Sequence, residues 1–286
     1  MEGNFSVFNS LRTQAFRILW AWTLVIGMIP AMLPAQQPAP PQPPGHIDPQ
    51  ARQMLDRTIQ ALGGQSFLNA KSLTSRGRVF FFSDGRTAGI QPFESKFVYP
   101  DKRRFAIAKA KKNISMDTGN VTYEGETKPI TLINNGEKGW ELDQYGLIVQ
   151  TDQQLQGWII SNRFSLENLL RLRLNEPGVL VQVGKVDFVD NVLTQGIEIV
   201  VAGGIRVRLD LNRQTFLPTR IVYRLRNLKE NDWDEYADAY ADYKDIDGIM
   251  TPMHITHYLN GDRIGEIFQT SAKYNEDYPP KDFSPE

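Results

Sequence analysis

The chain has 286 residues, of which 41% are hydrophobic, 10% aromatic and 23% charged, and its formal net charge is −1. This composition is typical of a globular protein and excludes a disordered chain. The near-neutral charge argues against general nucleic-acid binding, which needs a surplus of basic residues to neutralise phosphates. The chain has no cysteine and three histidines, which excludes disulfides, zinc–thiolate sites and cysteine nucleophiles.

The N-terminus has the pattern of an export signal. Arg12 and Arg17 precede an apolar run from Ile18 to Leu33, and Ala35 follows just before a polar break. This order predicts a signal peptide over residues 1–35, removed on export to the periplasm. An uncleaved N-terminal anchor is the alternative, since about 16 apolar residues fall short of the roughly 20 that a spanning helix needs.

A proline-rich segment follows, and then a single domain. Residues 36–47 predict an extended, unpacked tether, and residues 48–286 are expected to form one domain. Asp48 and Pro49 are favourable residues at the start of a helix. Apolar residues then recur at three- and four-residue spacing up to Gly63, which predicts an amphipathic helix.

From Leu73 onward the hydrophobic period changes to two, as expected for strands. The clearest alternation predicts that Val207, Leu209, Tyr223 and Leu225 are buried. Between these residues lie four arginines that are expected to be mostly exposed: Arg206, Arg208, Arg224 and Arg226. One buried face per strand is typical of antiparallel sheet. Turns are predicted at Asp84-Gly85, Pro100-Asp101, Asn135-Gly136, Gly203-Gly204, Asp247-Gly248 and Asn260-Gly261.

Two helical segments interrupt the strands. Leu155, Trp158 and Ile159 form one short apolar face, and apolar residues between Ser165 and Pro177 form another, at Leu166, Leu169, Leu170 and Leu174. The fold class is therefore α+β and mostly antiparallel β, with roughly 11 strands.

Two clusters in the sequence are candidate sites of chemistry. His254 and His257 are three apart on a predicted strand, so they point to opposite faces and are not expected to share a metal ion. The acidic stretch from Glu230 to Asp247 lacks EF-hand spacing; calcium is the functional interpretation, and a solvated strand face opposite arginines is favoured. No P-loop, dinucleotide-binding glycine pattern or HExxH motif occurs, so no cofactor and no catalytic group are expected.

A local basic patch also has two interpretations. It comprises Lys102, Arg103, Arg104, Lys109, Lys111 and Lys112. Such a patch is suited to contact anionic lipid headgroups. A solvated strand edge, where lysines discourage edge-to-edge pairing, is the favoured interpretation.

Four stretches together resemble the periplasmic carrier family of the outer-membrane lipoprotein localisation pathway. They are the opening helix Ala51 to Gly64, the strand–Pro–turn–strand element Phe97 to Phe105, the hairpin Ile130 to Leu142 with its Asn-Gly turn, and the closing Asp282-Phe-Ser-Pro285. The resemblance implies a curved, open half-barrel whose concave face is covered by helices and holds the acyl chains of a passenger. The family's best-known members commonly have Arg before the turn Pro. Tyr99 stands at that position here, so their lid-gating mechanism is not carried over.

The resemblance implies a non-enzymatic cell-envelope protein that shields an apolar or acyl-chain ligand. Candidate cavity or lid residues are Trp140, Leu142, Leu155, Trp158, Ile159, Leu169 and Leu170; ordinary core packing is the alternative for each. A second hypothesis is an interaction or sensor module on the same fold, with a membrane protein of the envelope as its partner. An apolar cavity favours the first hypothesis, and a filled core with an exposed apolar edge strand favours the second.

Overall fold

The computed structural model describes residues 45–285 apart from 115–120, 144, 190 and 228–229, and it describes side chains outside 109–129. The predicted signal peptide and most of the predicted tether lie outside the described residues. No helix in the described part of the chain is long and apolar enough to cross a membrane.

The described residues form one open sheet of 14 strands in the order β1-β8-β9-β10-β11-β12-β13-β14-β2-β3-β4-β5-β6-β7. The first seven strands are β1 (His46–Ile47), β2 (Ser72–Ser83), β3 (Arg86–Val98), β4 (Lys102–Ile114), β5 (Val121–Asn135), β6 (Lys138–Asp143) and β7 (Gly146–Val149). The others are β8 (Leu180–Val189), β9 (Val192–Val200), β10 (Arg206–Asn212), β11 (Pro218–Asn227), β12 (Asp232–Ile246), β13 (Ile249–Leu259) and β14 (Asp262–Tyr274). All neighbours are antiparallel except β1 and β8.

The predicted fold class is confirmed, with more strands than expected. The short strands β1 and β7 lie at the two edges of the sheet. Strand β1 is formed by the last residues of the segment predicted as a tether, where the His46 amide donates to Val179 at 3.0 Å. All six predicted turn dipeptides lie between paired strands. At Asp84, Asp247 and Asn260 the backbone φ is positive and a glycine follows, as in two-residue hairpin turns.

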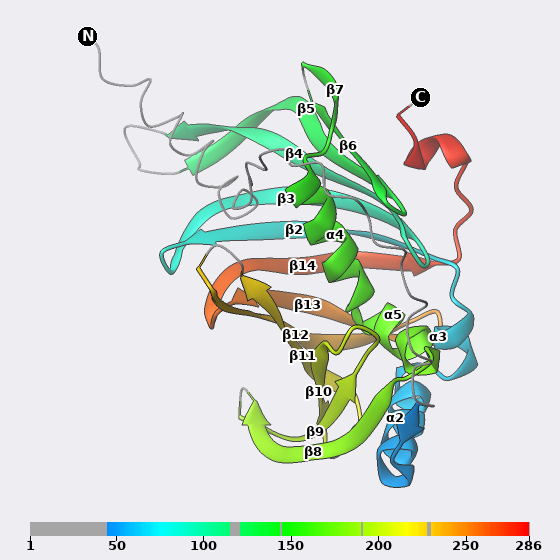
Figure 1. Ribbon diagram of the computed structural model, residues 1–286. Helices are drawn as coiled ribbons and strands as arrows, with labels where there is room; N and C mark the ends of the chain where they lie inside the picture. The colour runs from blue at the N-terminus through cyan, green and yellow to red at the C-terminus, as the bar shows by residue number, and fades with distance from the viewer. Residues whose placement is uncertain (1–44, 115–120, 144, 190, 228–229, 286) are drawn as a thin grey trace, which may run out of the picture.

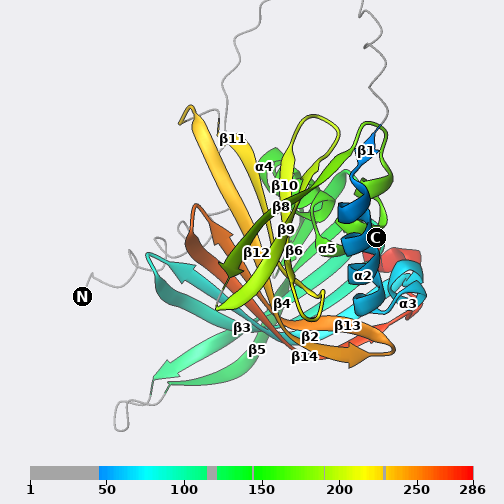
Figure 2. The same cartoon turned by 90° about the horizontal axis from the view of Figure 1, so that it is seen from below.

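The helices lie on one face of the sheet, which curves around them (Figures 1 and 2). They are α2 (Pro49–Leu62), α3 (Gln65–Asn69), α4 (Asp152–Arg163) and α5 (Leu166–Arg171), followed by the short 3-10 turn η1 (Arg173–Asn175). A second 3-10 turn, η2 (Pro280–Phe283), packs on the opposite face. We call the face that carries α2, α4 and α5 the inner face and the opposite one the outer face. The sheet divides into an N-terminal half, β2–β7, and a C-terminal half, β8–β14, which meet where β14 pairs with β2.

Helix α2 starts and ends where the sequence predicts. The Asp48 carboxylate accepts hydrogen bonds from the amides of Gln50 and Ala51 at 2.8 and 2.9 Å. The helix ends at Gly63, whose φ is +122° and whose added Cβ would lie 2.3 Å from the Gly248 carbonyl oxygen. Only glycine fits this turn, which seats α2 against the start of β13.

The buried core lies between α2, α5 and the C-terminal half of the sheet. All strand residues of the main buried cluster lie in β8–β14, among them Val207, Leu209 and Ile221, each at most 1% exposed. The predicted burial of Val207, Leu209 and Tyr223 is confirmed, and Leu225 is half-buried. This half of the inner face is therefore filled by side chains.

On the outer face of this half, three of the four arginines that were expected to be exposed are exposed: Arg206, Arg224 and Arg226. Arg208 is half-buried because its Nε donates to the Asp210 carboxylate at 2.6 Å. Asp210, which the alternation placed on the solvated face, is 0% exposed. Arg208 and Arg220 flank and cover this carboxylate, and their charges compensate its own.

Candidate functional site

Helix α4 crosses the inner face of the N-terminal half (Figure 1). Thr151 and Gln154 form a capping box at its start. Trp158 is the one fully buried residue of α4, while Leu155 and Ile159 are half-buried on the same side. Helix α4 therefore buries less of its surface against the sheet than the core helices do.

Trp158 packs on aromatic and basic side chains of β3 and β4. Its ring centroid lies 6.1 Å from that of Phe97, and the Arg103 guanidinium carbon lies 4.2 Å from the Trp158 ring centroid. Arg103 also donates to the Asn134 side-chain oxygen at 3.0 Å, and Asn134 donates to Gln150 at 2.9 Å. Burial lowers the pKa of Arg103 to about 10, so the group remains charged at neutral pH.

The inner face beyond Trp158 is apolar. Phe93 and Phe105 stack with ring centroids 5.2 Å apart. Phe105 and Ile107 share the face of Arg103 because they follow it at spacings of two, and Leu132 is paired with Phe105. Phe105, Ile107 and Leu132 are only half-buried. This surface is therefore the apolar area that α4 leaves incompletely covered.

Two polar contacts fix the corner between α4 and α5. The side-chain amides of Asn162 and Asn168 donate to the Pro100 carbonyl oxygen at 3.1 and 2.8 Å. At the other end of α4, the Gln154 amide lies 3.5 Å from the Glu141 carboxylate. Helix α4 is thus attached to the turn between β3 and β4 and to strand β6.

Helix α5 belongs to the core rather than to this surface. Leu169 and Leu170 are 0% and 2% exposed and pack in the main buried cluster with α2. The helix ends at Arg171, before the predicted end, and Leu174 lies in η1. Arg171 lies over the Tyr99 ring at 4.4 Å and donates to the Leu68 carbonyl oxygen. Tyr99, at the position where members of the resembled family commonly have Arg, therefore contacts Arg171 of α5.

The seven candidate cavity or lid residues fall into three groups. Leu155, Trp158 and Ile159 lie together on α4 and face the N-terminal half of the sheet. Leu169 and Leu170 lie in the core. Trp140 and Leu142, on β6, are paired with Ile133 and Thr131 of β5. These four residues alternate with Asn134 and Glu141, which face α4, so Trp140 and Leu142 lie on the outer face, away from the other five.

A histidine–carboxylate pair also lies on the inner face, and the sequence did not indicate it. His257 Nδ1 lies 2.6 Å from the Asp238 carboxylate. Ile255 and Tyr240 are each two positions away from His257 and Asp238 on the same strands, and both pack in the core. Because side chains two positions apart lie on one face of a strand, the pair lies on the inner face. Burial lowers the pKa of His257, but the charge and hydrogen bond of Asp238 outweigh it and the net shift is upward. His254 instead stacks on Phe268, with ring centroids 4.0 Å apart.

The acidic and basic stretches of the sequence are divided between the two faces. Glu235 pairs with Arg224 at 2.7 Å, as the solvated-face interpretation expects. Within the described residues, no group of three His, Asp or Glu side chains is close enough to hold a metal ion. Arg104 lies on the outer face, opposite Arg103, so the two do not form one patch. The side chains of Lys109, Lys111 and Lys112 lie outside the described part.

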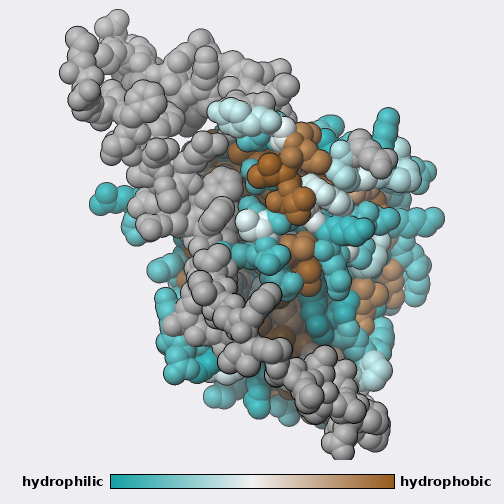
Figure 3. Space-filling view, turned by 45° about the horizontal axis from the view of Figure 1, so that its top comes forward, coloured by the Kyte–Doolittle hydropathy of each residue, from teal (hydrophilic) through white to brown (hydrophobic). Residues whose placement is uncertain are grey.

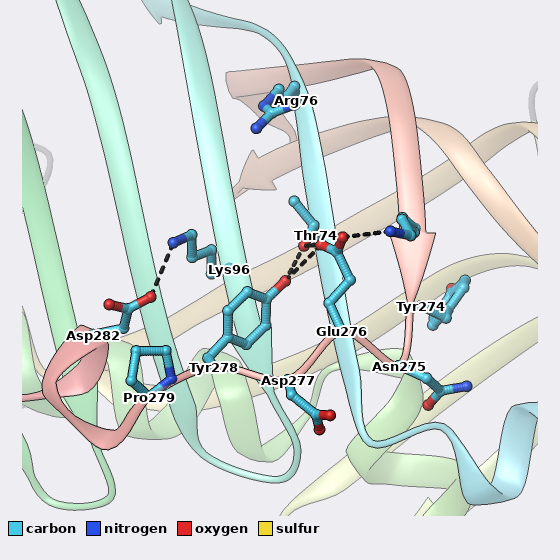
Figure 4. Close-up of a pocket in the computed structure, with 11 residues that line it drawn as sticks. Thr74, Arg76, Lys96, Tyr274, Asn275, Glu276, Asp277, Tyr278, Pro279 and Asp282 are labelled. Carbon is cyan, nitrogen blue, oxygen red and sulfur yellow. Dashed lines mark hydrogen bonds and ion pairs between the residues drawn. The ribbon is translucent and has the colours of Figure 1, made fainter.

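A pocket of about 580 Å³ opens on the outer face, where the C-terminal segment crosses β2, β3 and β14 (Figure 4). Its charged side chains neutralise one another. Lys96 pairs with Asp282 at 2.9 Å and Lys273 with Glu276 at 2.7 Å, while Thr74 donates a further hydrogen bond to Glu276. These hydrogen bonds, led by that from Lys273, lower the pKa of Glu276 to about 2. These ion pairs and hydrogen bonds therefore attach the C-terminal segment to the outer face of the sheet.

Comparison with known proteins concerns the fold. No protein-family model matches the sequence, and no characterised protein matches it closely. A solved DUF1329 family protein from Desulfovibrio piger superposes with a TM-score of 0.50 at 12% identity, covering 82% of this chain and 97% of that one. A LolA superfamily protein from Nitrosomonas europaea (TM-score 0.46, 14% identity) and a domain described as outer membrane lipoprotein-sorting from Vibrio parahaemolyticus (0.49, 8%) have the same coverage. At 12% identity, the likeness to the Desulfovibrio piger protein is one of fold.

Proposed function

We propose that this protein is an exported, non-enzymatic binding protein of the cell envelope. Its ligand is apolar or lipid-like and lies on the inner face of the N-terminal half, under α4. The observation that carries the proposal is the incomplete cover of this face. Trp158 is the one fully buried residue of α4, while apolar side chains of the helix (Leu155, Ile159) and of the sheet (Phe105, Leu132) stay half-buried.

An acyl chain fits this surface for a simple energetic reason. Each methylene that leaves water contributes about 0.8 kcal/mol, before the entropy of ordering the chain is subtracted. The ligand would complete the burial of side chains that α4 and the sheet leave half-exposed. The export signal predicted in residues 1–35 places this binding in the periplasm, where a lipid needs shielding from water.

The test is saturable binding of a fluorescent fatty acyl probe, combined with native mass spectrometry of protein purified from its own envelope. We expect about one probe per chain and a co-purifying lipid. Leu155→Asp places a charge on the side of α4 that faces the sheet and should weaken binding at least tenfold. Gln156→Asp adds the same charge to the exposed side of α4 and should bind like the wild type. Wild-type protein that binds no acyl probe would refute the proposal.

The second candidate function, a protein-interaction or sensor module, is favoured by one observation. Edge strand β7 exposes apolar side chains on both faces, with Ile148 61% and Val149 73% exposed. Figure 3, in which the top of the Figure 1 view comes forward, shows hydrophobic side chains gathered at the upper centre of the surface. Strand β7 contains no lysine or proline, the residues that commonly protect sheet edges. An extended segment of a membrane-protein partner would add to this edge as a further strand.

Because the chain has no cysteine, a single introduced cysteine is a unique attachment point. A photo-crosslinker on Ile148→Cys should capture a distinct partner in the envelope if β7 is an interaction edge. The control is Gln182→Cys, an exposed position on β8, near the opposite edge of the sheet. Equal capture from both positions would argue against β7 as the docking edge.

A further inference from the structure

Two buried N–H groups without acceptors meet under α4. The Nε atom of Arg103 and the indole Nε1 atom of Trp158 are both inaccessible to solvent and have no hydrogen-bond partner. The guanidinium carbon of Arg103 lies 4.2 Å from the Trp158 ring centroid, so the two groups are in contact. Buried donors are almost always paired in folded proteins, and two orphaned ones side by side require an explanation.

The charge of Arg103 faces aromatic rings but, in the described part of the chain, no counter-ion. Among the described residues, no carboxylate forms an ion pair with Arg103, whose side chain donates only to the neutral Asn134. Arg208, which is also half-buried, has Asp210 as its counter-ion. A partly desolvated cation on an apolar surface is unfavourable until an anion joins it. An anionic oxygen would accept hydrogen bonds from these N–H groups and would also supply a counter-charge for Arg103.

We propose that Arg103 and Trp158 form a head-group site for an amphiphile that carries a carboxylate or a phosphate. This inference rests on the proposed function and specifies the ligand as anionic. The guanidinium and the indole N–H donate to the anionic oxygens, as both atoms lack acceptors. The acyl chain extends from there along Phe105 and Leu132, whose apolar surface begins two residues further along β4.

The two donors belong to different elements of the fold. Arg103 lies on the sheet, and Trp158 is the only fully buried residue of α4. An anion that accepts from both joins the lid to the sheet. Binding of the head group therefore adds a further connection between α4 and β4, beside the existing contact of Trp158 with Arg103.

The experiment compares three ligands that share one chain: dodecanoate, dodecyl phosphate and dodecanol. Wild-type protein should bind the two anions about tenfold to a hundredfold more tightly than the alcohol, as expected for charge-assisted hydrogen bonds. Acetate and inorganic phosphate, which lack the chain, separate an amphiphile site from a site for free anions and should bind far more weakly. Titration calorimetry at pH 8 keeps dodecanoate ionised.

Variants assign the preference to these two residues. Arg103→Met should bind all three ligands with the affinity of the alcohol, and Trp158→Phe, which keeps an aromatic ring and loses the N–H, should lose part of the preference. Lys102→Met removes the same charge from an exposed neighbour on the outer face and should behave like the wild type. A denaturant melt of each variant establishes that it is folded.

The outcomes separate the two proposals. Equal affinity of the wild type for dodecanol and the anions, or an unchanged preference in Arg103→Met, overturns the head-group site and leaves apolar binding intact. Tight binding of inorganic phosphate alone replaces it with a free-anion site. Absence of binding by all three dodecyl ligands refutes the proposed function itself. If Arg103→Met does not fold, Trp158→Phe decides whether the indole N–H contributes.

Discussion

The two halves of the sheet share one inner face but use it differently. In the C-terminal half, β8–β14, helices α2 and α5 fill the curve with buried side chains, and strand residues such as Leu209 are 0% exposed. In the N-terminal half, β2–β7, helix α4 touches the sheet through Trp158 and leaves Phe105 and Leu132 half-buried. One half thus contains the main buried core, and the other retains apolar surface that is only half-buried.

The treatment of charge differs in the same way. In the C-terminal half the buried Asp210 is neutralised by Arg208 and Arg220. In the N-terminal half Arg103 has an amide as its partner and an orphaned Nε. A buried charge is costly unless it is paired, so the two halves differ in whether a carboxylate compensates a half-buried arginine within the chain.

The largest expected effect comes from placing a charge in each half. Leu169→Asp buries a carboxylate in the filled core without a partner and should prevent folding at 25 °C, since such a group costs several kcal/mol at least. Leu155→Asp, on the half-buried side of α4, should lower the free energy of unfolding by about 1 kcal/mol or less. Urea denaturation monitored by circular dichroism measures both. Similar losses would show that α4 is part of the core.

Truncation of a leucine in each half gives the next largest difference. Leu209→Ala should destabilise the protein by about 2–5 kcal/mol, as for a fully buried leucine that leaves a cavity. Leu132→Ala, at a half-buried position, should cost about 1 kcal/mol, in proportion to the smaller area that it removes from burial. Arg206→Ala, an exposed control, should stay within about 0.5 kcal/mol of the wild type. Equal costs for the two leucines would contradict the contrast between the halves.

Removing a charge should have opposite signs in the two halves. Asp210→Ala leaves two arginines without their carboxylate and should destabilise the protein by about 1.5–3 kcal/mol, the range for hydrogen bonds to charged groups. Arg103→Met removes an uncompensated cation from an apolar surface and should leave the ligand-free protein as stable as the wild type or more so. Thermal melts of ligand-free protein test both. A strong loss from Arg103→Met would show that its charge is satisfied within the chain.

Local patterns predicted the fold because most of its signals are short in range. The cap at Asp48, the turn glycines and the alternation at 205–211 each act over a few residues. The structure confirms the cap, the turns and the buried side of the alternation, whereas Asp210 on the other side is buried by its arginines. The site depends on contacts between distant segments, which no periodicity encodes. Trp158 meets Arg103 across 55 positions, and the sequence showed Arg103 only as one member of a basic run. Trp140 is one of the predicted cavity or lid residues, but the register of β6 places it on the outer face.

The smallest expected effect concerns pH and the pair His257–Asp238 on the filled half. The folded-state pKa of His257 is raised above its unfolded value of about 6.5, since the Asp238 carboxylate outweighs the effect of burial. A group with a raised pKa stabilises the fold fully below about pH 6.5, and this stabilisation is lost as the pH rises through the folded-state pKa. The free energy of unfolding should therefore fall between pH 6 and pH 8 in the wild type, and more steeply than in His257→Asn.

The difference should be small, because the His257 side chain is 37% exposed and solvent screens the pair. Urea melts at several pH values measure the two slopes, and the comparison with His257→Asn removes the contribution of Glu167, whose pKa burial also raises. Equal slopes in the wild type and in His257→Asn would show that the Asp238 carboxylate does not stabilise the protonated His257 side chain. The charges of the C-terminal half would then be compensated without His257.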